Sequence, residues 1–286
     1  MIRILLTLLT IGFASLAHAQ YYTAISSGNY YNGAVTVKKK SYDGRAYILF
    51  DFNRENNLVK AKYFARNAYS QFTNWRRGKE ILFATAGAYS DSYSSSASPV
   101  GLCVDNGAIV TRTPDMNMDG MVIVYNGGAQ EGGMAIVDMD VNPVKAFNAS
   151  YRPRDNSSER ISFLNWGQQN GLTLFQSHLV YSSDRSNNFP NMYYGEPRER
   201  RFLAICRRAG VVHHVIVDAP DMLELNKAAS NAKSVLESEG LSVSYIVNLD
   251  SGARNILHAY NGSLLKDYRP SNAKLEDYCA LLIYYK

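Results

Sequence analysis

Two aspartates, Asp218 and Asp250, are the residues of this sequence best suited to acid–base chemistry. Each follows a run of apolar residues typical of a buried strand, Val211–Val217 and Val243–Leu249. A helical pattern separates the runs, so the strands are predicted to be parallel and both aspartates to lie at one sheet edge. Paired carboxylates there could serve as general acid and base, or as nucleophile and acid on a glycosidic bond. The alternative is structural, with Asp218 capping the next helix and Asp250 opening a turn.

Oxygen-bearing side chains also gather at Asp115, Asn117 and Asp119, just before Gly120. Oxygens at alternate positions before a glycine match the opening of a calcium-binding loop. The glutamate that would complete such a loop is replaced by Asn126, and the flanking residues have a strand pattern. The segment therefore favours a polar turn, with a calcium site as the alternative. We expect the protein to require no cofactor.

The histidines and cysteines offer fewer candidates. His178 stands at the start of a predicted strand between irregular segments, which makes it a candidate for proton transfer. His213 and His214 are adjacent in a strand pattern, so they face opposite sides and do not easily share a metal. The three cysteines lie in apolar surroundings, allow at most one internal disulfide and resemble buried apolar residues: Cys103, Cys206 and Cys279. Nucleotide-binding, serine-hydrolase and zinc-protease motifs are absent from the sequence.

Residues 1–19 have the pattern of a secretory signal peptide. Arg3 precedes an apolar core, and Ala17-His18-Ala19 forms a small-x-small cleavage site. The core is too short to span a bilayer, which needs about 20 apolar residues. We therefore expect a secreted or periplasmic chain that begins at Gln20 and has no transmembrane anchor.

Composition is that of a globular protein, with 46% apolar and 19% charged residues. The formal net charge of +5 is spread along the chain. Two short basic runs, Lys38–Lys40 and Arg198–Arg201, are expected on solvated faces rather than on a nucleic-acid-binding stripe. No nucleic-acid partner is therefore predicted.

The N-terminal half should begin with a hairpin and a helix. Alternating residues at Ala34–Val37 and Arg45–Phe52 flank a turn at Asp43-Gly44. Apolar residues at three- and four-residue steps then predict one amphipathic helix over Leu58–Trp75. Short strands separated by glycine turns are predicted at Ile81–Ala84, Val100–Val104, Ala108–Arg112, Met121–Tyr125 and Met134–Met139. Polar stretches at residues 150–160 and 182–200 are expected to be loops.

The C-terminal third predicts strand, helix and strand. Asp221 and Glu224 form a capping-box pattern at the start of the helix, and Gly240 is a fitting C-terminal cap. The expected fold is therefore a single α+β domain over residues 20–286. It has a mixed, twisted sheet with flanking helices, including a C-terminal βαβ unit.

Five short motifs follow one another in a distinctive order. They are Ala84–Tyr89, Pro99–Gly107, Gln176–Val180, Arg201 with Ala204-Ile205, and Asn248–Gly252. The second matches the pattern Pro-x-Gly-Leu-x-x-x-x-Gly, and the last stands in place of Asn-Leu-Asp-Gly-Gly. This order resembles the phosphodiester glycosidase family from about residue 58 to residue 265.

Two of the motifs depart from that family. Thr85-Ala86-Gly87 replaces Asn-Gly-Gly, and Asp250-Ser251-Gly252-Ala253-Arg254 replaces Asp-Gly-Gly-Gly-Ser. Glycines there would let the backbone approach a phosphate or sugar closely, whereas side chains narrow the site. Arg254 adds a cation.

The resemblance implies hydrolysis of a sugar-1-phosphodiester or a related glycosidic bond of a glycan. Asp250 would be the catalytic carboxylate, with His178 as a second proton-transfer candidate. The residues implied in substrate binding are Gly87, Tyr89, Arg201, Asp218, Gly252 and Arg254. The altered glycine motifs favour the alternative, a non-catalytic protein that binds a glycan or a cell-surface polymer. A structural envelope protein, with side chains closing any cleft at Asp250, is a third interpretation.

Overall fold

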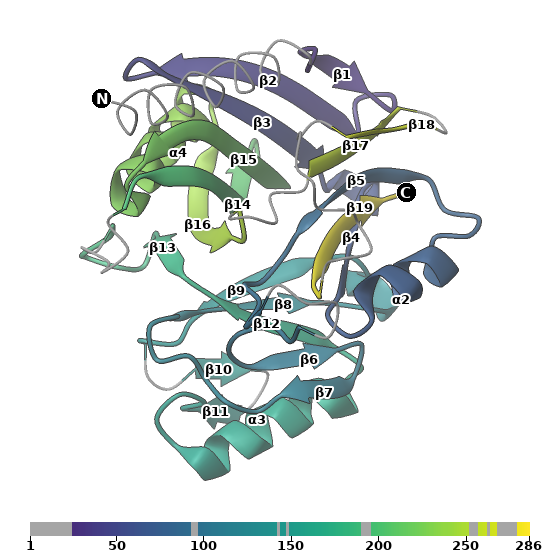
Figure 1. Cartoon of the computed structure of the whole chain (residues 1–286), viewed down its shortest axis with the longest axis vertical. Helices are drawn as coiled ribbons and strands as arrows, with labels where there is room; N and C mark the ends of the chain where they lie inside the picture. The colour runs from purple at the N-terminus through teal and green to yellow at the C-terminus, as the bar shows by residue number, and fades with distance from the viewer. Residues whose placement is uncertain are drawn as a thin grey trace, which may run out of the picture.

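The computed structural model describes residues 25–92, 97–141, 144–146, 149–189, 196–251, 257–261, 264–267 and 279–286. The predicted signal peptide, Gly252 and Arg254 lie outside these residues. Within them, the strands form three large antiparallel sheets and a small hairpin of β10 (Val144–Ala146) and β11 (Ala149–Tyr151) (Figure 1). In this described part, every helix is too short or too polar to cross a bilayer.

The largest sheet has seven strands and contains the predicted N-terminal hairpin. Its order is β1 (Gly28–Tyr30), β2 (Val35–Tyr42), β3 (Arg45–Asn53), β15 (Val211–Leu223), β14 (Arg198–Arg208), β16 (Ser242–Leu249) and β13 (Leu179–Ser182). Tyr42 pairs with Arg45 across the turn. Asp43 and Gly44 both have positive φ angles, 52° and 68°, as a two-residue hairpin turn requires. The predicted hairpin is thereby confirmed.

Two five-stranded sheets complete the framework. One has the order β7 (Ala108–Thr111), β6 (Cys103–Asp105), β12 (Thr173–Ser177), β8 (Gly120–Val124) and β9 (Met134–Asp138). The other has the order β18 (Leu264–Asp267), β17 (Leu257–Asn261), β5 (Ile81–Ala86), β19 (Leu281–Tyr285) and β4 (Lys60–Phe64). The strands predicted between residues 81 and 139 are therefore present, with β6 shorter than expected. Short 3-10 turns follow β3 and β8, at Glu55–Asn57 and Gly128–Gln130.

The three sheets pack their inner faces around one central core, and a helix covers the outer face of each. α4 (Leu225–Ser238) covers the seven-stranded sheet, α3 (Ser157–Gln169) the sheet of β6, and α2 (Ala68–Trp75) the sheet of β5 (Figure 1). Alternate residues of β3 show the division, since Phe50 and Phe52 enter the central core while Tyr47 and Leu49 face α4. A strand buried on both faces reads as a continuous apolar run.

Two predictions about where helices lie are wrong. The helix expected over Leu58–Trp75 is helical only from Ala68, because Lys60–Phe64 forms β4 and pairs with β19 near the chain end. The loop expected at residues 150–160 contains the start of α3. Asn156 caps this helix, its side chain accepting hydrogen bonds from the backbone N–H groups of Ser158 and Glu159.

The C-terminal βαβ unit is split rather than contiguous. β15 and β16 run parallel, as predicted, but β14 lies between them and pairs antiparallel with both. The α+β class is confirmed, but the sheets are antiparallel in every described strand pairing rather than mixed as expected. Asp221 does not cap α4, because its carboxylate accepts a hydrogen bond from the backbone N–H of Ala46 at 2.8 Å. Apolar residues of α4 face the sheet as the pattern predicted.

Stability should fall in acid because of His214, which is buried in the core beside Tyr284. Burial, helped by the positive charges of Arg54 and His213, lowers the pKa of His214 from 6.5 to about 3. The folded state therefore resists protonation. The stability that depends on a neutral His214 is fully present above pH 6.5, and it is lost as the pH falls from 6.5 toward 3. We expect His214→Leu to remove about 2 kcal/mol of the stability loss between pH 6.5 and 4.5, measured by urea unfolding. An unchanged pH dependence in this variant would contradict the assignment.

Candidate functional site

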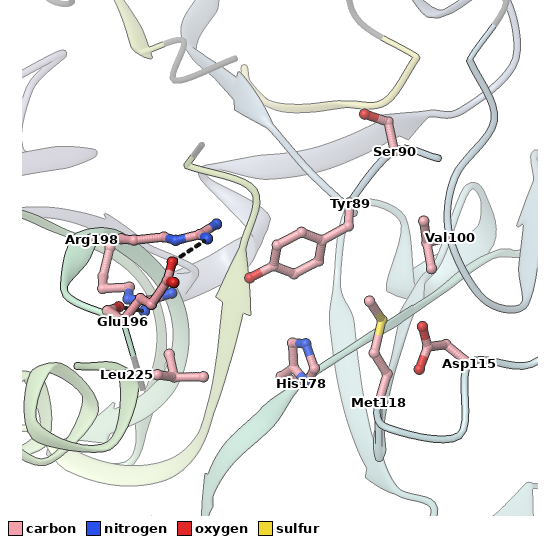
Figure 2. Close-up of a pocket in the computed structure, with 10 residues that line it drawn as sticks. Tyr89, Ser90, Val100, Asp115, Met118, His178, Glu196, Arg198 and Leu225 are labelled. Atoms are coloured by element: carbon pink, nitrogen blue, oxygen red, sulfur yellow. Dashed lines mark hydrogen bonds and ion pairs between the residues drawn. The ribbon is translucent and has the colours of Figure 1, made fainter. Parts of the chain in front are cut away.

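A cavity of about 500 Å³ opens where the seven-stranded sheet meets the loops of the β6 sheet. Its walls come from the β5–β6 connection, the β7–β8 loop, the β12–β13 junction and the starts of β14 and α4 (Figure 2). The lining residues are Tyr89, Ser90, Val100, Asp115, Met118, His178, Glu196, Arg198, Arg200 and Leu225. The predicted residues Tyr89, His178 and Asp115 thus share one cavity.

Gln176 holds two of these loops in place. Its buried amide oxygen accepts hydrogen bonds from the backbone N–H groups of Leu102 at 2.9 Å and Asp115 at 3.1 Å. Its amide nitrogen donates to the carbonyls of Asp115 and Met118, both at 2.6 Å. Gly101 packs on the same side chain with φ +83°, and a Cβ there would lie 2.6 Å from the Gln176 oxygen. The glycine of the Pro-x-Gly-Leu motif is therefore required by the packing of Gln176.

His178 lies at the cavity with its ring oriented by a backbone carbonyl. Its Nδ1 is 3.1 Å from the oxygen of Asn117, which can only accept, so Nδ1 carries the proton and Nε2 the lone pair. Burial lowers the pKa of His178 below 6.5. The Asn117 hydrogen bond and the charges of Asp119 and Asp115 oppose this shift, and Arg200 adds to it. The neutral ring can accept a proton at neutral pH.

The segment considered for calcium is a turn that supports His178. Asp115 accepts a hydrogen bond from the backbone N–H of Asn117 at 2.8 Å. Asp119 accepts from the backbone N–H of Leu179 at 2.8 Å and forms an ion pair with Arg185 at 2.7 Å. Among the described residues, no three His, Cys, Asp or Glu side chains are arranged to hold a metal. Calcium binding at this turn stays a prediction, and the ion would have to displace Arg185 from Asp119. The melting temperature measured with calcium and with a chelator tests it.

Tyr89 and Asp250 are linked through Asn248 and the end of β16. The buried Asn248 side chain donates a hydrogen bond to the Tyr89 hydroxyl, and its backbone N–H donates to the carbonyl of His178 at 2.9 Å. The Tyr89 ring meets the His178 ring edge-on, with centroids 5.5 Å apart. Burial, followed by the negative charge of Asp250, raises the pKa of Tyr89 well above its usual range. The hydroxyl therefore stays protonated and can donate a hydrogen bond into the cavity.

Asp250 directly follows β16 and is partly buried. Its backbone N–H donates to the carbonyl of Gly87 at 3.0 Å, which fixes the two motifs side by side. A Cβ on Gly87 would overlap the ring of Tyr63, whose hydroxyl accepts a hydrogen bond from the backbone N–H of Ala88. Packing on Tyr63 thus accounts for the glycine.

Arg201 and Asp218 form a fully buried ion pair beneath the cavity. Nε and Nη2 of Arg201 both lie 2.9 Å from one carboxylate oxygen of Asp218, and Nη1 donates to the Thr85 hydroxyl at 2.8 Å. Neither Arg201 nor Asp218 lines the cavity. Asp218 was expected beyond its strand, but β15 continues to Leu223, so that placement is wrong.

The sequence pattern missed the two arginines that do line the cavity, Arg198 and Arg200. Arg200 is only 5% exposed, and its guanidinium donates to the carbonyls of Leu223 at 3.3 Å and Glu196 at 3.0 Å. The expectation of a solvated basic run is therefore wrong for Arg200 and Arg201. Alternation along β14 was the usable signal for Arg200, since it directs this side chain to the side opposite its neighbour Arg201. It does not extend to Arg198, because the pairing of β14 with β15 is irregular between Arg198 and Arg200.

No protein-family model and no curated protein sequence matches the chain. Its fold is similar to the catalytic domain of zebrafish N-acetylglucosamine-1-phosphodiester alpha-N-acetylglucosaminidase, solved auto-inhibited by its pro-peptide. The TM-score is 0.50 at 10% identity, covering 91% of this chain and 86% of that one. A hypothetical protein from Synechocystis gives a TM-score of 0.51 at 11% identity, covering 88% of this chain and 61% of that one. The expected resemblance is thus confirmed at the level of the fold, and the residue roles stay predictions.

Removing one partner of the buried ion pair should destabilise the protein strongly. Asp218→Asn keeps the shape of the side chain but leaves the Arg201 charge buried without its carboxylate. We expect the free energy of unfolding to fall by about 3 kcal/mol or more. Urea unfolding would measure it, with Arg198→Gln, an exposed charge, as a control that changes stability by about 0.5 kcal/mol or less. The combined Arg201→Met and Asp218→Leu variant should regain part of the loss. An Asp218→Asn protein as stable as the wild type would refute this account.

Proposed function

We propose that this chain is an exported hydrolase, secreted or periplasmic, that cleaves a sugar-1-phosphodiester or a related glycosidic bond of a glycan. The observation that carries the proposal is the grouping at one cavity of a basic wall, a histidine and a protonated tyrosine. Asp250 is not one of the lining residues, but its negative charge contributes to the raised pKa of Tyr89. The similarity of the fold to a phosphodiester glycosidase catalytic domain supports the same reaction class.

The roles follow from the charges that such a reaction develops. Asp250 would act on the anomeric carbon, as nucleophile or by activating water, and would stabilise the positive charge that builds on the sugar ring. A phosphomonoester is a good leaving group, so it needs charge stabilisation more than a strong acid. Arg198 and Arg200 supply that stabilisation as charge-assisted donors. Tyr89 would donate to an oxygen of the bound substrate, and Nε2 of His178 would accept or return a proton.

One observation favours the alternative, a protein that binds a glycan or surface polymer without cleaving it. Arg201, which the family resemblance assigns to the phosphate, is buried against Asp218 and Thr85. Its guanidinium would have to break the buried ion pair to reach a ligand in the cavity. Binding without turnover would then rest on Arg198, Arg200 and the aromatic ring of Tyr89.

Asp250→Asn decides between these two functions. If Asp250 is the catalytic carboxylate, the variant should lose about 100-fold or more of kcat on any sugar-1-phosphodiester that the wild type cleaves, with binding retained. A panel of such diesters, followed by phosphomonoester release, provides the measurement. Glu55→Gln, an exposed substitution after β3, is the control and should match the wild type. Equal turnover by wild type and Asp250→Asn would refute the catalytic role, and glycan binding without turnover by the wild type would support the alternative.

A further inference from the structure

We propose that Glu196 is a built-in counter-ion that makes the cavity select a singly charged phosphodiester over a doubly charged phosphomonoester. The proposal deepens the proposed function and rests on the same cavity, but it concerns binding and does not require turnover. It assigns a specificity-determining role to Glu196, which the sequence pattern does not single out.

Glu196 contacts both arginines of the cavity wall. Its carboxylate lies 2.9 Å from a terminal nitrogen of Arg198, and its carbonyl accepts a hydrogen bond from Arg200 at 3.0 Å. All three residues line the cavity. In Figure 2 the Glu196 and Arg198 side chains lie together on the wall that the Tyr89 hydroxyl points toward.

The two arginines and Glu196 together carry one net positive charge. A phosphodiester carries one negative charge at pH 7, so it neutralises this wall. A phosphomonoester carries about 1.5 to 2 negative charges, since its second pKa is about 6. The additional charge would stand close to the Glu196 carboxylate, and like charges at a shared site repel. The wall therefore matches a diester better than a monoester.

The opposite side of the cavity also disfavours added negative charge. Asp115 lines that side, separated from Arg198 by Tyr89 and His178 (Figure 2). Its carboxylate can accept hydrogen bonds from sugar hydroxyls but repels phosphate. The anionic group is thus confined to the arginine wall, and the sugar ring lies toward Asp115 and the apolar side chains of Val100 and Met118.

This arrangement would limit inhibition by the product. Hydrolysis of the diester at the sugar carbon breaks the C–O bond, adds the oxygen of water to the sugar and leaves a phosphomonoester. The product carries more negative charge than the substrate, so the same Glu196 that tolerates the diester weakens binding of the monoester. The exposed Glu196–Arg198 pair contributes little stability, so a ligand can rearrange it at small cost.

The probes are methyl phosphate and dimethyl phosphate. They differ in the negative charge of the phosphate, which is the property that Glu196 is proposed to discriminate. Their affinities for the full chain can be measured by titration with NMR detection of arginine side-chain and backbone signals. Wild type should bind dimethyl phosphate at least as tightly as methyl phosphate. Glu196→Gln should tighten methyl phosphate about threefold, with a smaller effect on dimethyl phosphate. Arg200→Gln should weaken both about tenfold.

Glu237→Gln is the matched control, because it removes an exposed glutamate at the far end of α4. It should leave both affinities unchanged. Two results would overturn the proposal. One is a Glu196→Gln variant with the same ratio of affinities for the two phosphates as the wild type, and the other is an Arg200→Gln variant that binds both phosphates as tightly as the wild type. Because neither probe is turned over, a chain without hydrolase activity can still pass this test, and an active hydrolase can still fail it.

Discussion

The buried ion pair between Arg201 and Asp218 is the interaction on which the arrangement of the site depends. It joins adjacent strands of the seven-stranded sheet and, through the Thr85 hydroxyl, reaches β5 of a second sheet. A charge this deep is tolerated only when its partners satisfy it. The pair therefore fixes how the two sheets meet, directly beneath the edge where Gly87 and Asp250 lie side by side.

Above this pair, the loops of the cavity are fixed by amides and backbone groups rather than by ion pairs. Gln176 satisfies all four of its bonds with the two loops that frame the cavity. Asn248 joins Tyr89 to the strand that precedes Asp250. Neutral donors and acceptors of this kind hold geometry without adding charge, so the field inside the cavity is set by the arginine wall and the carboxylates.

Burial, more than this field, explains the protonation states of the two titratable groups His178 and Tyr89. Burial keeps His178 neutral and Tyr89 protonated, each for the same reason, which is the cost of a charge away from water. The cavity thus offers one proton acceptor, His178, and one proton donor, Tyr89, and the charge of Asp250 acts on the second. Such a pair suits bond cleavage with a phosphate leaving group, and it equally suits recognition of sugar hydroxyls.

The sequence by itself determined the N-terminal hairpin, the direction of β15 and β16, the apolar face of α4 and the position of Asp250 at a strand end, because local spacing fixes each of these. It also contains the five short motifs in the order whose resemblance to a known family predicts this fold. It could not distinguish β4 from a helix, because the partner strand comes from the chain end, more than two hundred residues later. Only the tertiary structure decided that Arg201 is buried and Arg200 lines the cavity. Adjacent residues on a strand face opposite sides, and which side is the core depends on the sheets that pack against it.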